Sequence, residues 1–480
     1  MRNSNLNEHK IKGKRMIPPF MDAMGDKLKI NYWHYNRMPE YLWISLIIDE
    51  YGRNEGLRNC AYIRDFIREN NLNIPNGRFS EILELTKIEQ EKLFEFMKKY
   101  NKNYIFDTLT LVCRNNQIFK KYFYKKEINN DIRINRLKNI IKKTYDKESN
   151  HTTDVKAMII AFYDGKIHVL EKCSNMIQTL QNYQFTSHNA PEMTLYRSSI
   201  RAMEIALCNI KQSKYYLYFW EVVNDLDECN IYAIKNKKGK PMDIFIEDTK
   251  KELQYTYSKL TINELNTNKK NEILIGIATY AYKLMNEINT YNLYNTISAR
   301  LILRTILDCY INIKFLVKEE QKNKQIWDEF KSYGLGQYKK NYKKNIEKGS
   351  IVTHFSPKFL ELLVNEEKNE EFLVIDFGNF SKKTIRNKAI EIEELDLYET
   401  IYEYDTQYGH GYWGAIRESS MLMCNNVLHN YHNVPDFNNE IILPDISNDA
   451  KLIMIKIMKV LDTQLEINKE YGEKYYEGNL

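Results

Sequence analysis

Glycine and proline are scarce in this chain, which has 480 residues of which 17 are glycine and 9 are proline. Both values lie well below average usage. Because these two residues dominate tight turns, their scarcity favours long helices over many short strands. The phosphate-binding loop G-x-x-x-x-G-K-[ST] is absent as well. The sequence therefore excludes a nucleoside triphosphatase of the P-loop class.

Metal-binding patterns are also lacking. The seven cysteines are scattered and form no C-x-x-C, which argues against a zinc site and against a disulfide framework. His429 and His432 are three residues apart, but no acidic cluster surrounds them, and a metal site needs three or four ligands. The sequence therefore predicts no metal and no cofactor, and each cysteine is expected to pack as a small apolar residue.

Long apolar runs are missing too. The sequence has no stretch of about 18 uncharged apolar residues, which a membrane helix would need. The N-terminal residues are polar and lack the apolar centre of a signal peptide. We therefore expect a cytoplasmic protein with no membrane association.

What is present is a globular chain of helical character. Hydrophobic residues make up 43% of the sequence, and in most segments they recur every three or four residues, as on one face of a helix. The predicted fold class is all-α, with multi-helix bundles in two domains, residues 1–250 and 251–480. The exception is a small β-hairpin near 230–247, where two short β-branched and aromatic runs flank a turn.

The expected helices extend over much of the chain. One is long, at 268–318, with an interruption near 290–293. The apolar run 372–377 is of ambiguous type. The other helices are expected at 38–48, 80–100, 107–124, 130–145, 153–183, 191–211, 381–394 and 448–471.

Positive charge is in excess near the N-terminus. The whole chain carries a formal charge of +6, whereas residues 1–150 alone contain 29 Lys and Arg against 19 Asp and Glu. Basic charge attracts phosphate in a sequence-independent and salt-sensitive way. An AT-rich genome would also enrich Lys, together with Asn, Ile and Tyr. Both a nucleic-acid partner and a compositional origin therefore stay open.

Charged groups interrupt the apolar helix that begins near residue 299. Arg300, Arg304 and Asp308 follow one another at intervals of four and so share one face. A charge among leucines and isoleucines is costly unless it is paired. Arg304 and Asp308 therefore form either a structural ion pair or part of an anion site. In the anion site the Arg304 guanidinium binds phosphate, Asp308 holds its orientation and Arg300 adds charge.

A single histidine, His410, lies between two glycines in the tyrosine-rich segment 402–413. Near neutral pH a histidine can act as an acid or a base. Arg417, about two helical turns later, could stabilise charge beside it. The alternative is a buried histidine with a structural role. The predicted catalytic residues are His410, Arg304, Asp308 and Arg417, and the predicted binding residues are Arg300, Tyr310, Tyr404 and Tyr408.

These two segments resemble a widespread bacterial family of helical proteins of unknown function. The helix Arg304-Thr-Ile-Leu-Asp308 is similar to its Arg-Ser-Leu-Leu-Glu helix, with Asp in place of Glu. Residues 379–386 loosely match its Asn-x-Ser-Ile-Arg helix start, and residues 402–411 match its segment of tyrosines followed by a histidine. The resemblance covers roughly residues 265–435. It implies a layout similar to that of HEPN proteins, many of which are ribonucleases in toxin and antiviral systems.

The resemblance leads us to expect an effector or accessory protein of a bacterial antiviral or toxin-like system. Its activity would be that of a metal-independent endoribonuclease acting through the C-terminal helical cleft. However, no histidine follows an arginine by four to six residues, as in the HEPN ribonuclease signature. A non-catalytic helical module that binds RNA, another nucleic acid or a partner protein of a defence operon is therefore an alternative. A sensor of a nucleotide signal is another.

Self-association is the last expectation. Aromatic residues make up 13% of the chain, and long amphipathic helices often bury a surplus apolar face against a second copy. We therefore expect a homo-oligomer to which the helix at 268–318 or the helix at 448–471 contributes.

Overall fold

The computed structural model describes residues 6–24, 32–163, 175–207, 213–349, 354, 356–364 and 380–466. Helices dominate these residues and strands are confined to two small sheets, which confirms the all-α fold class. Among the described residues, no helix combines the length and the apolar character that a membrane crossing needs. The apolar run 372–377 and part of the helix expected at 153–183 lie outside the described residues.

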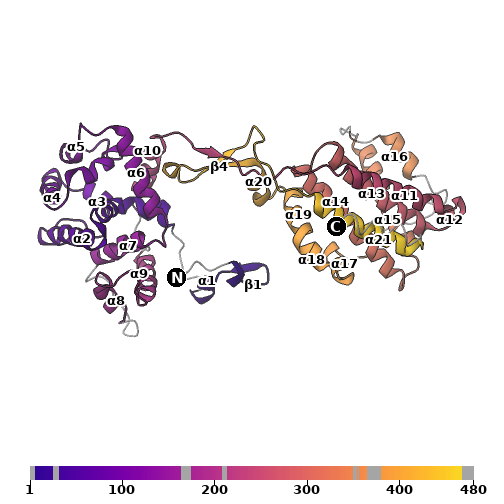
Figure 1. The fold of residues 1–480 in the computed structure, drawn as a ribbon, viewed down its shortest axis with the longest axis horizontal. Coiled ribbons are helices and arrows are strands. Elements are labelled where there is room, and N and C mark those ends of the chain that lie inside the picture. Colours follow the sequence, from indigo (N-terminus) through magenta and orange to yellow (C-terminus); the bar gives the residue numbers. More distant parts are fainter. Residues whose placement is uncertain are drawn as a thin grey trace. The chain divides into compact units, whose positions relative to one another are not determined.

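The chain divides into two compact units, whose helices can be followed in Figure 1. Unit 1 comprises residues 1–232 and 423–433, and unit 2 comprises residues 233–422 and 434–480. The first division falls between residues 232 and 233, earlier than the expected residue 250. The reason is that Met242, Phe245 and Ile246 are buried in the core of unit 2. A second difference is that a short segment returns to unit 1 late in the chain.

Unit 1 is built around one long helix, α2 (Leu42–Glu69), which packs on α7 (Asn150–Phe162). The single helix expected at 80–100 is split, because Thr86 starts a new helix by forming a capping box with Glu89. The other helices of this unit are η1 (Leu6–Glu8), α1 (Pro19–Met24), η3 (Trp33–Arg37), η4 (Met38–Tyr41), α3 (Phe79–Leu83), α4 (Lys87–Tyr100), η5 (Asn103–Leu111), α5 (Gln117–Phe123), α6 (Asn130–Tyr145), α8 (Asn175–Tyr183), α9 (Met193–Leu207), α10 (Tyr215–Asn224) and η9 (Val427–His429).

The core of unit 1 is rich in aromatic side chains. The ring of Phe94 meets those of Phe119 and Phe123 edge-on, with centroids 5.4 and 5.2 Å apart. A buried charge in this unit is also paired, because Arg133 donates to both carboxylate oxygens of Asp107 at 2.8 and 3.2 Å. This buried pair is therefore satisfied by short, charge-assisted bonds.

Unit 2 is a helical bundle centred on α14 (Ile297–Glu319), which packs between α13 (Lys269–Thr290) and α21 (Ser447–Leu465). The interruption expected near 290–293 is present between α13 and α14. The helices expected to contribute to self-association thus bury apolar faces against one another within this unit. The remaining helices are α11 (Asp243–Lys259), α12 (Ile262–Thr267), α15 (Ile326–Lys348), α16 (Pro357–Val364), α17 (Ile385–Glu391), α18 (Leu395–Leu397), η8 (Tyr398–Tyr402), α19 (Glu403–Gly409) and α20 (Trp413–Ser420).

The strands are short. β1 (Lys10–Lys12) and β2 (Arg15–Ile17) form an antiparallel hairpin. The other sheet has the order β3 (Ile231–Tyr232), β4 (Met421–Cys424), β5 (Asn433–Pro435), and β3 pairs antiparallel with β4 with Ile231 opposite Cys424. This corrects the hairpin expected near 230–247. Its first run is a strand, but its second run begins helix α11, where Asp243 lies in the first turn and favours a helix start.

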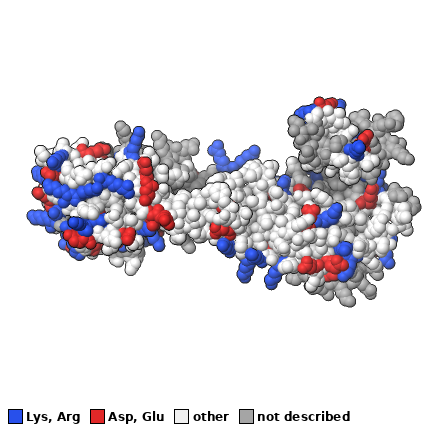
Figure 2. Space-filling model, turned by 90° about the horizontal axis from the view of Figure 1, so that it is seen from above, with Lys and Arg blue, Asp and Glu red and all other residues white. Residues whose placement is uncertain are grey.

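Basic and acidic side chains are interspersed on the face that Figure 2 shows. Within unit 1, Lys102 and Arg136 both pair with Glu50, and Lys143 pairs with Asp49. Because these carboxylates belong to the same 150 residues, the pairs spread the charge locally but leave the basic excess of residues 1–150 in place. Exposed pairs of this kind contribute little stability, about 0–1 kcal/mol each.

We predict that Gly56→Ala destabilises unit 1. The helix α2 is broken at Gly52, whose φ of 73° and ψ of 176° are not helical. A Cβ on Gly56 would lie only 2.6 Å from the backbone Cα of Ile48, which cannot move aside as a flexible side chain would. We expect the free energy of unfolding, measured by urea denaturation, to fall by about 1–3 kcal/mol.

Gly276→Ala in α13 is the matched control. Nothing outside its own helix lies within 4 Å of the added Cβ, so the better helix propensity of alanine raises stability by about 0.5–1 kcal/mol. Equal effects of the two substitutions would contradict the close packing at Gly56.

Candidate functional site

The helix α14 carries three of the predicted site residues on one face. It begins because Thr296 caps it, accepting a hydrogen bond from the Ala299 N–H. Arg300, Arg304 and Asp308 then follow at successive turns. Arg300 is buried and the other two are half-buried. These charges therefore need partners from neighbouring elements.

Arg304 finds its partners in η8 and α19. Its guanidinium donates to the Tyr402 hydroxyl at 2.8 Å and lies over the ring of the same tyrosine, 4.6 Å from the centroid. A Cβ on Gly409 would lie 3.2 Å from its Nη1, so the absence of a side chain there lets the guanidinium approach the end of α19. Among the described residues no ion pair joins Arg304 to Asp308. The partner that the structure shows for Arg304 is Tyr402.

Asp308 lies beside a different cation. Burial raises the pKa of its carboxyl to about 6, against the opposing effects of Arg304 and Lys388. Burial likewise lowers the pKa of Lys388 to about 8. The Lys388 ammonium donates to Asn312 Oδ1 at 3.0 Å and lies 4.2 Å from the centroid of the Phe380 ring. Asp308 Oδ1 is buried and has no hydrogen-bond partner among the described residues. No local sequence pattern points to Lys388 as a member of this site.

Arg300 faces a second buried carboxyl. It donates to the carbonyl oxygen of Pro444 at 2.6 Å. Asp405 on α19 is buried, which raises the pKa of its carboxyl to about 7; Arg300 and Arg304 oppose this shift, whereas Asp449 adds to it. Asp405 Oδ2 has no hydrogen-bond partner among the described residues. Arg300, Arg304 and Asp308 on α14 and Asp405 on α19 thus combine two arginines with two carboxyls whose pKa is raised by burial.

The two predicted binding tyrosines of α19 share one acceptor. The hydroxyls of Tyr404 and Tyr408 donate to Glu418 Oε2 at 2.6 and 2.9 Å. This pairing ties α19 to α20. Arg417 donates from Nη1 to the Met421 carbonyl at 2.8 Å and so caps the end of α20. These residues hold the two short helices together around the turn between them.

His410 lies on that turn, which we call the His410 turn (residues 409–413). Its side chain is exposed and stacks on the ring of Tyr412, with centroids 5.5 Å apart. Tyr412 and Trp413 are 57% and 63% exposed, so the turn presents three rings at the surface. Its glycines have the spacing G-x-G-x-x-G, but they join two helices rather than a strand and a helix, and no dinucleotide-binding unit is formed.

Tyr310 belongs to a different surface. It lies two residues after Asp308, about 200° further round the helix. Its hydroxyl bonds to Glu394, which also pairs with Lys314 and Lys456. These residues line an open hollow of about 600 Å³. The structure therefore places Arg300 and Arg304 beside α19 and Asp308 beside Lys388 of α17, and it leaves Tyr310 apart from them.

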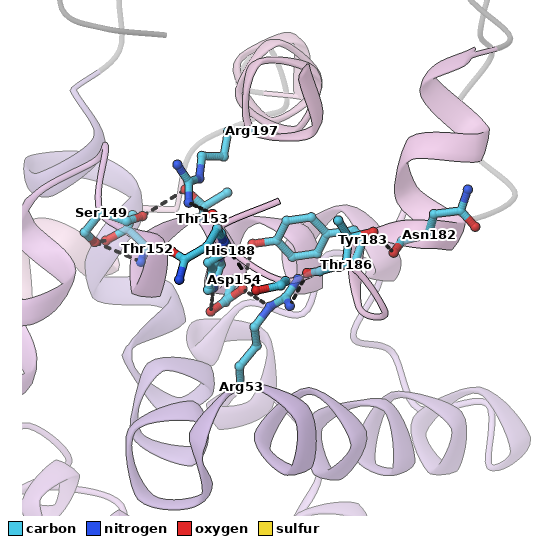
Figure 3. Close-up of polar contacts among 12 residues, drawn as sticks. Arg53, Ser149, Thr152, Thr153, Asp154, Asn182, Tyr183, Thr186, His188 and Arg197 are labelled. Atoms are coloured by element: carbon cyan, nitrogen blue, oxygen red, sulfur yellow. Dashed lines mark hydrogen bonds and ion pairs between the residues drawn. The ribbon is translucent and has the colours of Figure 1, made fainter. Parts of the chain in front are cut away.

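Unit 1 contains a polar centre that the sequence reasoning did not find (Figure 3). The buried carboxylate of Asp154 accepts hydrogen bonds from Arg53 Nε at 2.9 Å and from the Tyr183 hydroxyl at 2.6 Å. His188 Nε2 lies 3.1 Å from the other oxygen. Arg53 donates further to the carbonyls of Tyr183 and Thr186. This network fixes the loop between α8 and α9 to α2 and α7, which is a structural role.

Cysteine and histidine side chains also converge in unit 1. Cys229, Cys424, His429 and His432 each place one ligand atom within 4.8 Å of the others. Each cysteine was expected to pack as a small apolar residue, whereas the Sγ atoms of Cys229 and Cys424 lie against histidine nitrogens. The spacing C-x4-H-x2-H over residues 424–432 was a local signal for this group, but nothing in the sequence points to Cys229.

We predict that Asp405→Asn stabilises unit 2 at neutral and higher pH. The folded pKa of Asp405, about 7, lies above the ordinary 3.8. The favourable contribution of the protonated carboxyl is therefore complete below about pH 4 and is lost as the pH rises through about 7. Asn cannot ionise, so at pH 8 the variant should exceed the wild type by about 1–3 kcal/mol in denaturation experiments.

The control is Glu403→Gln, which removes an exposed carboxylate from the same helix. Its stability should follow the wild type across this range. Stability curves of Asp405→Asn and wild type that stay parallel from pH 4 to pH 8 would contradict the raised pKa.

We predict that Asp154→Ala destabilises unit 1 strongly. The substitution leaves Arg53 part-buried without its carboxylate and also removes the acceptor of Tyr183, which costs about 3–5 kcal/mol for a buried pair. Chemical denaturation measures the loss. Asp225→Ala, at an exposed position of the same unit, should change stability by less than about 0.5 kcal/mol. A loss at Asp154 no larger than that at Asp225 would refute the anchoring role.

Comparison with known proteins finds a match to a family model over part of the chain, which includes the α14–α19 region. Residues 271–426 match the model of a family of unknown function, DUF5677. The match includes α14, the His410 turn and Cys424, and it agrees with the resemblance to a family of unknown function found from the sequence. No curated protein and no solved structure matches the chain.

Proposed function

We propose that unit 2 binds single-stranded RNA at the His410 turn and cleaves it without a metal ion. The observation that carries this proposal is the position of the Arg304 guanidinium. It is held by Tyr402 against Gly409, the residue immediately before the exposed His410. A fixed positive charge beside an exposed acid–base group is what cleavage of a phosphodiester requires.

Exposed rings favour a single-stranded ligand. His410 and Tyr412 are stacked, and Trp413 follows them at the surface. Bases of a single strand stack on such rings, and each stacked base contributes about 1–3 kcal/mol. In a duplex the faces of the bases are already stacked on one another. The aromatic surface of the turn therefore supports binding of a single strand.

The chemistry assigned to His410 is removal of the proton from a ribose 2′-hydroxyl. The 2′-oxygen then attacks the adjacent phosphorus, the bond from phosphorus to the 5′-oxygen breaks, and the leaving oxygen takes a proton from solvent. The products are a 2′,3′-cyclic phosphate and a 5′-hydroxyl. Arg304 would stabilise the negative charge that builds up on the phosphoryl oxygens. DNA lacks the 2′-hydroxyl and would not be cleaved.

The biological setting rests on resemblance. The α14 helix and the His410 segment resemble a bacterial family whose layout is similar to that of HEPN proteins. Many HEPN proteins are ribonucleases of toxin and antiviral systems. We therefore propose that the chain is an effector or accessory protein of such a system.

A second candidate function is binding of a partner protein through the same surface. Tyr412, Trp413 and Ile416 are exposed around one turn, and exposed Trp and Tyr side chains are typical of the residues that dominate protein interfaces. In that case Arg304 and Tyr402 would only shape the surface.

The test of the cleavage proposal uses purified chain and a single-stranded RNA in the presence of EDTA. We expect fragments that end in 2′,3′-cyclic phosphate. His410→Ala should slow their formation by about 10²–10⁴-fold, because that is the usual contribution of a general base. His354→Ala, at another exposed histidine of unit 2, should leave the rate unchanged. Intact RNA with the wild-type chain would reject the nuclease proposal.

Trp413→Ala distinguishes the two candidates. If the turn binds RNA, the substitution should weaken RNA binding by the equivalent of about 1–3 kcal/mol per stacked base. RNA binding that is unchanged, together with loss of a protein recovered by affinity purification, would favour the partner-binding module.

A further inference from the structure

Four side chains from two distant parts of the sequence meet in unit 1. Cys229 follows α10, Cys424 ends β4, His429 ends η9, and His432 lies just beyond it. The Cys229 Sγ atom is 3.3 Å from His429 Nδ1 and 3.6 Å from His432 Nε2. The Cys424 Sγ atom is 3.5 Å from the same Nδ1 of His429. All four ligand atoms lie within 4.8 Å of one another.

These distances are those of ligands around one tetrahedral ion. Zinc lies about 2.3 Å from sulfur and about 2.0–2.1 Å from an imidazole nitrogen, which places sulfur and nitrogen about 3.6 Å apart at tetrahedral angles. An S–H···N hydrogen bond would explain one short contact. It would not explain why two sulfur atoms approach one nitrogen, His429 Nδ1, which has a single lone pair.

Both imidazoles are also oriented for a metal. His429 Nε2 lies 3.1 Å from the carbonyl oxygens of Asn224 and Asp227. A carbonyl oxygen only accepts, so Nε2 carries the proton and Nδ1 presents its lone pair to the sulfurs. His432 shows the mirror arrangement, with Nδ1 lying 3.3 Å from the His429 carbonyl and Nε2 facing Cys229. Metal-binding histidines typically have their second nitrogen held in this way.

From this geometry we infer that Cys229, Cys424, His429 and His432 bind one structural Zn²⁺ ion. Two thiolates balance the charge of the ion, which suits the burial of Cys424 and His429. Four protein ligands complete a tetrahedral site and leave no open position for a substrate, so the ion is structural and not catalytic. The inference is independent of the RNA cleavage proposed for unit 2.

The ion would hold the returning segment, residues 423–433, to the end of α10. Other contacts act in the same place. The Asn426 side-chain amide donates to Asp227 Oδ2 at 2.7 Å and to the Glu228 carbonyl at 2.9 Å, and the Tyr145 hydroxyl donates to Asn430 at 3.0 Å. A zinc ion would add to these part-buried hydrogen bonds a link whose free energy of binding is also free energy of folding.

The test measures metal in the full-length chain, purified under reducing conditions without added metal. Elemental analysis should find one zinc per chain. Exchange for Co²⁺ should give the visible absorption of a tetrahedral cobalt ion with sulfur-to-cobalt charge transfer. Cys424→Ser and His429→Gln should lose the zinc. Cys309→Ala, which removes a cysteine of unit 2, should keep it.

Two results would overturn the inference. One is a reduced wild-type chain with no more zinc than Cys424→Ser and no cobalt spectrum. The other is a disulfide between Cys229 and Cys424, found by mass spectrometry of the chain alkylated without reduction. The cobalt titration uses the wild type alone, so it decides the question even if the variants fold poorly.

A chelator should lower the melting temperature of the wild type and leave that of Cys424→Ser unchanged.

Discussion

The return of residues 423–433 to unit 1 is the constraint on which the rest of the structure depends. Val427 and Leu428 are buried in the core of unit 1, together with residues from α2, α6 and α10. Burial of two such side chains contributes about 3–6 kcal/mol, a large share of the stability of an ordinary domain. Unit 1 is therefore complete only after the chain has passed through most of unit 2, and its folding cannot finish while the N-terminal half alone has been synthesised.

This arrangement links the candidate site to unit 1 along the chain. The His410 turn leads into α20, α20 is capped by the bond from Arg417 to Met421, and Met421 begins β4. β4 ends at Cys424, opposite Ile231. Few residues separate the exposed rings of the turn from the anchored segment.

Much of the helical architecture could be predicted from the sequence, because apolar periodicity and few glycines and prolines report directly on helices. The helix α6 and the interruption between α13 and α14 follow from such local signals. The strand partner of Ile231 could not be predicted from the sequence, because β4 lies far along the chain and no local pattern specifies it. Residues 242–246 were assigned to a strand because of their β-branched and aromatic side chains, although they begin α11 with an acidic first turn.

In the candidate site, too, local features could be predicted from the sequence, whereas contacts between distant segments could not. The spacing of Arg300, Arg304 and Asp308 predicted a shared face correctly, because spacing on one helix is a local property. The partner of Arg304 was expected to be Asp308, whereas the structure supplies Tyr402 from another helix. A metal site at His429 and His432 was not expected because no acidic cluster surrounds them, and the cysteines were set aside because they form no C-x-x-C. Groups assembled from distant segments become visible only once the fold is known.

Hydrogen exchange of the full-length chain tests the central claim most directly. If residues 423–433 belong to the core of unit 1, the amides of Leu428 and its neighbours should exchange as slowly as those of α10. A Val427→Asp substitution should then accelerate exchange in α6 and α10. Rapid exchange of this segment in the wild type, or acceleration confined to unit 2 in the variant, would contradict the account.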